Sequence, residues 1–332
     1  MTRNILIVKT SSLGDVIHNM PAVSDIARHW PNARIAWLVE ESYAPLVALH
    51  RAVDQVIPVA LRRWRRQLSR VGSWRELAQL RAVLKELRFD VIIDTQGLVK
   101  SAVLTRMAAG ERVGFDRASA REPLAARAYD RVVAVDRALH ATERCRRLCA
   151  AALGYSLGAS GPLDYGLKTV PNLEVNLGSS RQSRRALLLH GTARAEKLWP
   201  EEQWHSLARS LAAQGWQIEF VRGSEAEAAR SERLAAALPN AMVHPPLAID
   251  QLTHTMQGLG LVIGVDTGLL HLAAALEVPL VGIFGATSAA LTGPQGRAPI
   301  EVCGSTGSFP TFTDVLNAVS RLLPSSELNV IN

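Results

Sequence analysis

The segment Leu261-Val-Ile-Gly-Val-Asp-Thr-Gly-Leu-Leu-His-Leu-Ala273 contains the pattern that decides the fold. Residues 261–265 form an apolar run with the length of a buried strand, and Asp266-Thr267-Gly268 is a short polar turn. An apolar helical segment follows at once. A continuous apolar strand that leads directly into a helix is typical of a parallel sheet covered by helices on both faces. The segment therefore predicts an α/β fold.

Strands and helices alternate in the same way along both halves of the chain. In the N-terminal half we expect strands at 4–8, 34–39, 54–59, 91–94 and 132–135, and helices near 16–29, 73–88, 98–108 and 141–153. In the C-terminal half we expect strands at 186–190, 217–221, 241–243, 261–264 and 279–283, and helices at 201–214, 225–237, 248–257, 268–276 and 313–323. Such spacing predicts right-handed βαβ units and parallel sheets.

Two doubly wound, Rossmann-like domains are therefore expected, joined by a stretch containing Gly, Pro and Ser at about 154–183. The N-terminal domain would cover 1–165 and the C-terminal domain 166–312. We expect residues 313–332 to form a helix and tail that pack back on the N-terminal domain. Open α/β sheets bind ligands outside the carboxyl ends of their strands, so the loops at those ends are the candidate sites.

The composition is that of a folded protein with sizeable cores. The chain has 332 residues, of which 48% are hydrophobic and 20% charged, with a mean hydropathy of +0.08. These values exclude a disordered or fibrous protein. Three cysteines without metal-ligand spacing predict neither a disulfide framework nor a zinc site. The sequence shows no secretory signal, and its longest apolar stretch is interrupted by polar residues and a proline, so we expect a cytoplasmic location without a membrane span.

Positive charge is concentrated in the N-terminal half. Residues 1–165 contain 25 Lys and Arg and 16 Asp and Glu, a net charge of +9, while the remainder carries −2. The densest cluster surrounds Trp64 and consists of Arg62, Arg63, Arg65, Arg66 and Arg70. A nucleic acid, a phospholipid surface or a phosphorylated substrate would each satisfy this charge, and so would a solvated helix face.

The first candidate loop is Lys9-Thr-Ser-Ser-Leu-Gly-Asp15, which follows the first strand. The loop lacks GxGxxG, so a dinucleotide cofactor is not expected there. Asp15 opens a helix, where a carboxylate commonly caps the first turn. A carboxylate at a strand–helix junction can equally serve as a general base. A second loop, Asp94-Thr-Gln-Gly-Leu-Val-Lys100, places Asp94, Gln96 and Lys100 where they either contact a ligand or cap a helix.

The candidate loops of the C-terminal half favour an anionic ligand. Small residues at 191–193 let backbone amides approach a phosphate, and Lys197 offers a positive charge. The helix that begins after Thr267-Gly268 adds exposed N–H groups. Between these loops, Glu225 follows a strand and could accept hydrogen bonds from ribose, although Glu227 lies close by. The sequence contains no Asp-x-Asp, so we expect no carboxylate-held metal.

Taken together, five segments resemble the lipopolysaccharide heptosyltransferase I family. They are Lys9–His18, the Arg-Arg-Trp-Arg cluster at 62–65, Asp94–Ser101, Gly114–Pro123 and Val265–Ala273, and the match runs from residue 4 to about 320. The resemblance implies a GT-B glycosyltransferase whose two Rossmann-like domains face each other across a cleft. The N-terminal domain would bind the acceptor and the C-terminal domain the ADP-sugar.

The resemblance also implies a reaction. Such enzymes move L-glycero-D-manno-heptose from ADP-heptose to the inner Kdo of Kdo2-lipid A with inversion at the anomeric carbon, which needs one base and no covalent intermediate. Asp15 would be that general base, and Lys197 would stabilise the departing ADP. Donor contacts would be Thr192, Lys197, Glu225, Asp266, Thr267, Gly268 and His271. Acceptor contacts would be Ser12, Arg62, Arg63, Arg65, Arg66, Gln96, Lys100 and Arg121.

From this resemblance we expect no tightly bound cofactor, no metal and no nucleic-acid partner. The basic half and the lipid acceptor predict peripheral association with the inner face of the inner membrane. Three other functions remain to be distinguished: a heptosyltransferase II that uses a heptosylated acceptor, a sugar-nucleotide epimerase of the same fold, and a non-catalytic binder of nucleic acid or phospholipid. The epimerase needs no basic acceptor domain, and the binder would show no glycosyl transfer.

Overall fold

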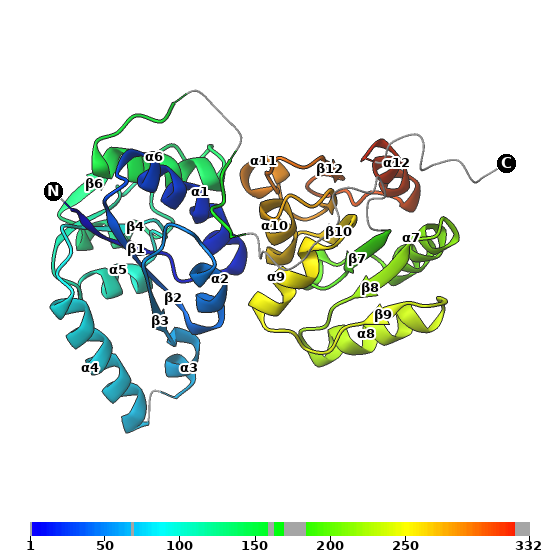
Figure 1. The fold of residues 1–332 in the computed structure, drawn as a ribbon, viewed down its shortest axis with the longest axis horizontal. Helices are drawn as coiled ribbons and strands as arrows, with labels where there is room; N and C mark the ends of the chain where they lie inside the picture. The colour runs from blue at the N-terminus through cyan, green and yellow to red at the C-terminus, as the bar shows by residue number, and fades with distance from the viewer. Residues whose placement is uncertain (1, 68–69, 159–162, 169–183, 323–332) are drawn as a thin grey trace. The chain divides into compact units, whose positions relative to one another are not determined.

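The computed structural model describes residues 2–67, 70–158, 163–168 and 184–322, and it divides the chain into two units, Met1–Lys168 and Thr169–Asn332 (Figure 1). The first boundary lies three residues beyond the one expected from sequence. Each unit has its own parallel sheet with helices on both faces, as the alternating pattern predicted.

Unit 1, residues 1–168, is built on a six-stranded sheet with the order β3-β2-β1-β4-β5-β6. Every neighbouring pair in this sheet is parallel. Its strands are β1 (Asn4–Val8), β2 (Arg34–Glu40), β3 (Gln55–Val59), β4 (Val91–Asp94), β5 (Glu111–Phe115) and β6 (Arg131–Val133). From β1 the strands are added first on one side, as β2 and β3, and then on the other, as β4, β5 and β6. Ligands bind in such sheets at this switch point, between β1 and β4.

Helices of unit 1 cover both faces of its sheet. Helices α1 and α6 lie side by side on one face (Figure 1), while α4 and α5 pack on the other, where Leu80, Leu84 and Leu104 join one hydrophobic core. The helical segments are α1 (Leu13–His29), η1 (Glu41–Tyr43), α2 (Ala44–Ala48), α3 (Leu61–Arg66), α4 (Val71–Glu86), α5 (Val99–Thr105), η2 (Pro123–Ala128) and α6 (Ala141–Leu153).

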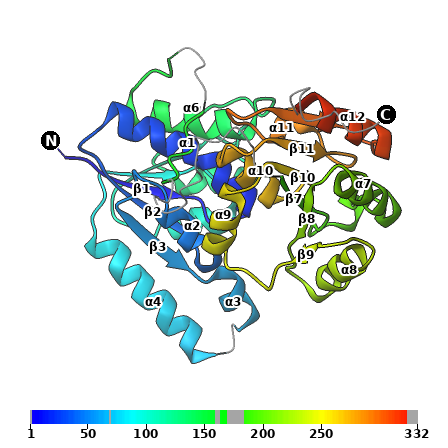
Figure 2. The ribbon, with the colours of Figure 1, turned by 45° about the vertical axis from the view of Figure 1, so that its right-hand side comes forward.

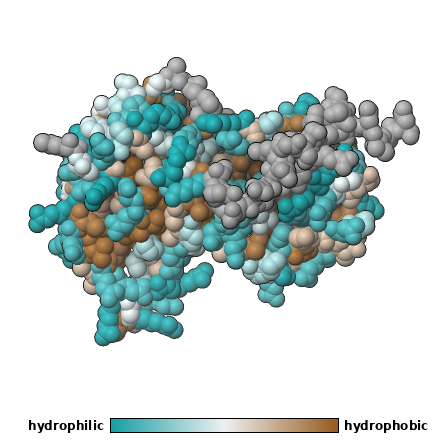
Figure 3. All heavy atoms as spheres, viewed as in Figure 1, coloured by the Kyte–Doolittle hydropathy of each residue, from teal (hydrophilic) through white to brown (hydrophobic). Residues whose placement is uncertain are grey.

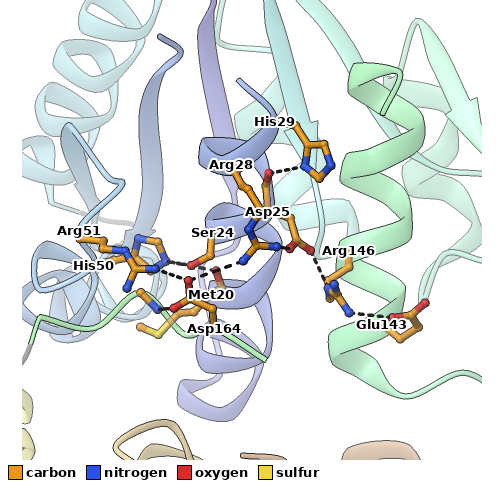
Figure 4. Close-up of polar contacts among 11 residues, drawn as sticks. Met20, Ser24, Asp25, Arg28, His29, His50, Arg51, Glu143, Arg146 and Asp164 are labelled. Carbon is orange, nitrogen blue, oxygen red and sulfur yellow. Dashed lines mark hydrogen bonds and ion pairs between the residues drawn. The ribbon is translucent and has the colours of Figure 1, made fainter. Parts of the chain in front are cut away.

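Helix α1, which carries Asp15 in its first turn, is fixed by buried polar contacts on its second half (Figure 4). Asp25 accepts a hydrogen bond from Arg146 Nε of α6 at 2.6 Å and one from Arg28 at 3.0 Å. His50 Nε2 lies 3.3 Å from Ser24 Oγ and 3.2 Å from the carbonyl oxygen of Met20. Because burial lowers the pKa of His50 to about 4, its ring is neutral at pH 7.

Unit 2, residues 169–332, repeats the strand order of unit 1. Its parallel sheet has the order β12-β11-β10-β7-β8-β9, with the switch point between β7 and β10. The strands are β7 (Arg185–Leu189), β8 (Gln217–Phe220), β9 (Met242–Val243), β10 (Leu261–Val265), β11 (Leu280–Ile283) and β12 (Ile300–Cys303).

Figure 2 shows α7, α8 and α12 on one side of this sheet and α9, α10 and α11 on the other. The helical segments are η3 (Ala195–Lys197), α7 (Glu201–Ala213), α8 (Glu225–Ala236), α9 (Ile249–Gln257), α10 (Gly268–Ala275), α11 (Ala289–Thr292) and α12 (Phe312–Leu322). Val315, Ala318 and Val319 of α12 are buried in the core of unit 2. The helix expected to pack back on the N-terminal domain is therefore part of unit 2, and the rest of that expected tail, 323–332, lies outside the described residues.

One strand in each sheet was not predicted. Glu111–Phe115 begins with two charged residues and Ile300–Cys303 contains Glu301, so neither forms the apolar run that identified the other strands. Within the described residues, no helix has both the length and the apolar character needed to cross a membrane.

Candidate functional site

Asp15 lies at the carboxyl edge of the unit 1 sheet, in the first turn of α1. Its Oδ2 accepts hydrogen bonds from the backbone N and the Oγ of Ser12, each at 2.9 Å. Its Oδ1 lies 3.4 Å from Nη1 of Arg121, and a quarter of the side chain stays exposed. Asp15 therefore caps its helix and still presents a carboxylate to solvent, so the capping and catalytic interpretations are compatible.

The surroundings of Asp15 favour its ionised form. Burial raises the pKa of its carboxyl group. The positive charges of Lys9 and Arg121 and the hydrogen bonds from Ser12 lower this pKa by more than burial raises it. The net result is a pKa below the ordinary value. The carboxylate is therefore charged at neutral pH and free to accept a proton.

Lys9 and Gln96 hold the loop beneath Asp15. Lys9 is 6% exposed, and its Nζ donates to the carbonyl oxygen of Thr95 at 2.8 Å. The Oε1 of Gln96 accepts from both the N and the Oγ1 of Thr10 at 2.8 Å, and its Nε2 donates to the carbonyl oxygen of Ser11 at 2.7 Å. Gln96 was expected to contact the acceptor; in the structure its side chain is buried and its amide is used within the protein.

The carboxylate of Asp94 also accepts its hydrogen bonds from groups within the protein. Its side chain is fully buried, with Oδ2 accepting from the hydroxyl of Tyr129 at 2.8 Å and Oδ1 from the backbone N of Gln96 at 2.9 Å and of Gly97 at 3.2 Å. Burial raises the pKa of Asp94 despite these donors. Asp94 thus fixes the loop after β4, which is a structural role.

The arginine cluster forms α3 and is only partly available to a ligand. Trp64 points inward, and Arg63 is bound by Glu41 and Glu76 at 3.1 and 2.9 Å. Arg62 donates to the hydroxyl of Tyr43 at 2.9 Å and remains exposed. The side chains of Arg65, Arg66, Lys100, Arg121 and Ser12 are also exposed.

Lys100 connects this cluster electrostatically to Asp15. Its Nζ donates to Ser11 Oγ at 2.8 Å. Burial lowers its pKa, the charge of Arg62 lowers it as well, and Glu40 and Asp15 oppose the shift. Both Arg62 and Asp15 therefore lie within electrostatic range of one ammonium group. The edge of unit 1 thus combines one accessible carboxylate with several accessible cations.

Unit 2 brings Lys197 and Asp266 together at its own carboxyl edge. The Nζ of Lys197 and the Oγ1 of Thr287 each lie 2.5 Å from Asp266 Oδ2. Thr192 Oγ1 donates to the carbonyl oxygen of Asp266 at 3.3 Å. The sequence reasoning did not identify Thr287, because it lies after β11 in a segment without other site residues. Asp266 therefore orients Lys197 and joins three loops.

Backbone groups complete this edge. Thr267 is the N-cap of α10, so the backbone amides of the first helical turn, which begins at Gly268, are available at this edge near Lys197. His271 is buried within the helix, with 5% of its surface exposed. An anion placed here would meet one ammonium group and the positive end of a helix.

The acid near this edge is Glu227 rather than Glu225. Glu227 Oε2 accepts from the backbone N of Gly223 and Ser224 at 2.9 and 3.0 Å. Its Oε1 comes so close to Gly191 that a Cβ there would lie 2.5 Å away. Glu225 is exposed in the first turn of α8. Across the described residues, no three His, Cys, Asp or Glu side chains gather where they could hold a metal ion.

Comparison with known proteins adds to this geometry. Residues 77–317 match the family model of glycosyltransferase family 9 (heptosyltransferase). Over 302 residues the chain is 46% identical to lipopolysaccharide heptosyltransferase 1 of Pseudomonas aeruginosa, covering 90% of this chain and 83% of that protein. The solved structure of E. coli heptosyltransferase WaaC with ADP is 38% identical and superimposes with a TM-score of 0.85, covering 96% and 98% of the two chains. The same enzyme with ADP-2-deoxy-2-fluoro heptose gives 0.84 at the same identity and coverage.

Proposed function

The chain belongs to glycosyltransferase family 9, the heptosyltransferases, and from this premise we propose which acceptor it uses and which residues carry the reaction. It is a transferase that moves heptose from a nucleotide-heptose donor in lipopolysaccharide core biosynthesis. The proposed donor is ADP-heptose and the proposed acceptor is the inner Kdo of Kdo2-lipid A. The observation that carries the proposal is the accessible, ionised carboxylate of Asp15 among exposed cations.

The donor is proposed to bind at the carboxyl edge of unit 2. Lys197, Thr192 and the first turn of α10 would contact the diphosphate, and Glu227 would accept hydrogen bonds from the ribose. When the glycosidic bond to ADP breaks, negative charge gathers on the leaving phosphate. A fixed ammonium group and helix amides that already point to this position stabilise that charge without reorganising.

The acceptor is proposed to bind at the carboxyl edge of unit 1. Arg62, Arg65, Arg66 and Arg121 would meet its phosphates and carboxylates. Asp15 would take the proton from the attacking Kdo hydroxyl as the new bond forms, and attack from the face opposite the leaving ADP inverts the anomeric carbon. One base suffices for this single displacement, so no covalent glycosyl-enzyme forms.

The proposal includes a location and a cofactor requirement. A lipid acceptor and a basic unit 1 support peripheral association with the inner face of the inner membrane. Because Lys197 and the α10 amides would stabilise the diphosphate, we expect the reaction to need no metal or other cofactor. Addition of a chelator is therefore expected to leave the rate unchanged.

The test is ADP release from ADP-heptose with heptose-free Kdo2-lipid A, comparing the native chain with Asp15→Asn. The asparagine keeps an oxygen for the Ser12 hydrogen bonds but cannot take a proton. We expect the variant to lose about 10²- to 10⁴-fold in turnover while ADP binding, measured by calorimetry, is unchanged. The matched control is Asp136→Asn, an exposed carboxylate of the same unit, which should retain native turnover.

Other outcomes assign the function differently. Full activity in Asp15→Asn would move the base to another residue. Release only with a heptosylated acceptor would indicate a heptosyltransferase II, and conversion of the nucleotide sugar without any acceptor would indicate an epimerase.

A further inference from the structure

The outer side of α4 carries a stripe of exposed residues with an unusual order. Val71, Trp74, Ala78, Arg81 and Lys85 follow one another at intervals of three and four, so they share one side of the helix. All five are exposed, whereas Ser73, Leu80 and Leu84 on the opposite side are buried. The stripe is apolar at the start of the helix and basic at its end. We call these five residues the α4 stripe.

The apolar part of the α4 stripe is more exposed than large hydrophobic residues usually are. Val71 is 66% exposed and Trp74 58% exposed. On the same face of the sheet, Val99 and Val103 of α5 are 40% and 51% exposed, and Figure 3 shows hydrophobic side chains gathered over α5 beside α4. Exposed tryptophan and valine side chains on two helices of one face indicate an interaction surface.

The charge around the stripe defines the partner. Residues 61–88 contain nine Arg and Lys and only two acidic residues, a net charge of +7 that equals the net charge of the whole chain. Exposed cations that flank a tryptophan and aliphatic side chains fit the surface of an anionic bilayer, where lipid headgroups attract the cations and the indole enters the interface. A second copy of the chain that docked through its own α4 stripe would bring an equally positive surface and be repelled.

A partly buried contact connects α4, on the side opposite the stripe, to α3. Glu76 on the inner side of α4 accepts hydrogen bonds from Arg63 Nη1 at 2.9 Å and from Trp64 Nε1 at 2.7 Å. Helix α3 is therefore fixed to α4. Arg62, Arg65 and Arg66 are exposed on α3, so they stay at a fixed position relative to the stripe.

We propose that the α4 stripe, with Val99 and Val103, docks unit 1 on an anionic phospholipid bilayer. The inference rests on the proposed function for its purpose, since a lipid acceptor is what such docking would deliver. Trp74 and Val71 enter the interface, and Arg81 and Lys85 bind headgroups.

The experiment is co-sedimentation of the full chain with vesicles of phosphatidylcholine alone or mixed with phosphatidylglycerol. We expect binding to the mixed vesicles only, decreasing with salt. Trp74→Ser and the double variant Arg81→Gln/Lys85→Gln should each lower the partition by about tenfold. Leu291→Ser and Arg209→Gln change an exposed leucine and an exposed arginine of unit 2 and should bind as the native chain does.

A second readout places Trp74 directly. Brominated lipids should quench the fluorescence of the native chain more than that of Trp74→Phe, because the indole of Trp74 enters the interface. Equal quenching, or native vesicle binding by the Trp74→Ser and double variants, would overturn the docking surface. Binding to DNA that is lost in the same variants, without vesicle binding, would also overturn it in favour of a nucleic-acid surface.

Transfer to a de-acylated, water-soluble acceptor separates this inference from the proposed function. The stripe variants should retain native turnover on that acceptor and lose turnover only on acceptor presented in vesicles. Native transfer without any vesicle binding would refute the docking surface and leave the function intact. Vesicle binding without transfer would refute the proposed function and leave the docking surface intact.

Discussion

Units 1 and 2 have the same strand order but opposite charge. Residues 1–168 contain 26 basic and 16 acidic residues, a net charge of +10, and residues 169–332 contain 11 and 14, a net charge of −3. At its carboxyl edge, unit 1 presents a carboxylate among arginines, whereas unit 2 presents a lysine, hydroxyl groups and a helix N-terminus. The sheet order therefore determines where a ligand can bind, and the side chains at that edge determine which ligand it is.

The sharpest test of this division compares two lysines at the two edges. Lys197→Met removes the ammonium group beside Asp266, so we expect turnover to fall about 10²- to 10³-fold and ADP binding to weaken. Lys100→Met in unit 1 should raise the KM for the acceptor and leave ADP binding unchanged. Calorimetry with ADP and acceptor-dependent ADP release measure both effects. A loss of ADP affinity in Lys100→Met as large as that in Lys197→Met would break the division.

A smaller effect concerns stability, where the two units should behave alike. Burial lowers the pKa of His50 in unit 1 and of His190 in unit 2 to about 4, from an ordinary value of 6.5. The unfolded chain therefore binds more protons between pH 6.5 and 4, and the free energy of unfolding falls as the pH decreases through this window. Each histidine should contribute a loss of about 3 kcal/mol.

The measurement is urea unfolding at several pH values, with hydrogen exchange read separately in each unit. His50→Gln should flatten the pH dependence in unit 1 only, and His190→Gln in unit 2 only. His205→Gln, a change at a half-buried position of α7, should leave both slopes as they are. An unchanged slope in unit 1 of His50→Gln would contradict the assignment.

The smallest expected effect distinguishes the charge of Arg121 from its binding role. Arg121 helps to lower the pKa of Asp15, so Arg121→Gln should raise that pKa and move the acidic limb of the pH–rate profile to higher pH. The shift should be modest, because Arg121 is 55% exposed and its charge is screened. Arg127→Gln, at an exposed position of the neighbouring η2 segment, should leave the profile in place. A limb that moves to lower pH would exclude Asp15 as the titrating base.

Apolar runs and turn residues were sufficient to predict most of both sheets. They failed at β5 and β12, where Glu111, Arg112 and Glu301 interrupt short strands whose pairing depends on neighbours distant in sequence. A local sequence pattern does not show which distant strand a segment pairs with. The α12 helix was predicted, but its packing in the core of unit 2 was not, because the amphipathic pattern of a helix does not identify the surface that it packs on.

The candidate site was predictable in its loops and less so in its side chains. Asp15, Lys197 and Asp266 lie at strand ends, as the sequence indicated. The sequence could not show that Gln96 and Asp94 point inward, nor that Glu227 rather than Glu225 lies beside Gly191. The burial of Lys9 was not predicted, since a lysine that follows a strand shows no sign of being buried.

The amide of Gln96 has a consequence for how the protein tolerates mutation. Its oxygen accepts two hydrogen bonds from Thr10 while its nitrogen donates one to Ser11. Glutamate has the right length but no donor, and asparagine has the right groups on a shorter side chain. In a library of all single substitutions, position 96 should therefore be as intolerant as a residue that contacts substrate. Such a library would identify it as a binding residue although it functions as part of the framework.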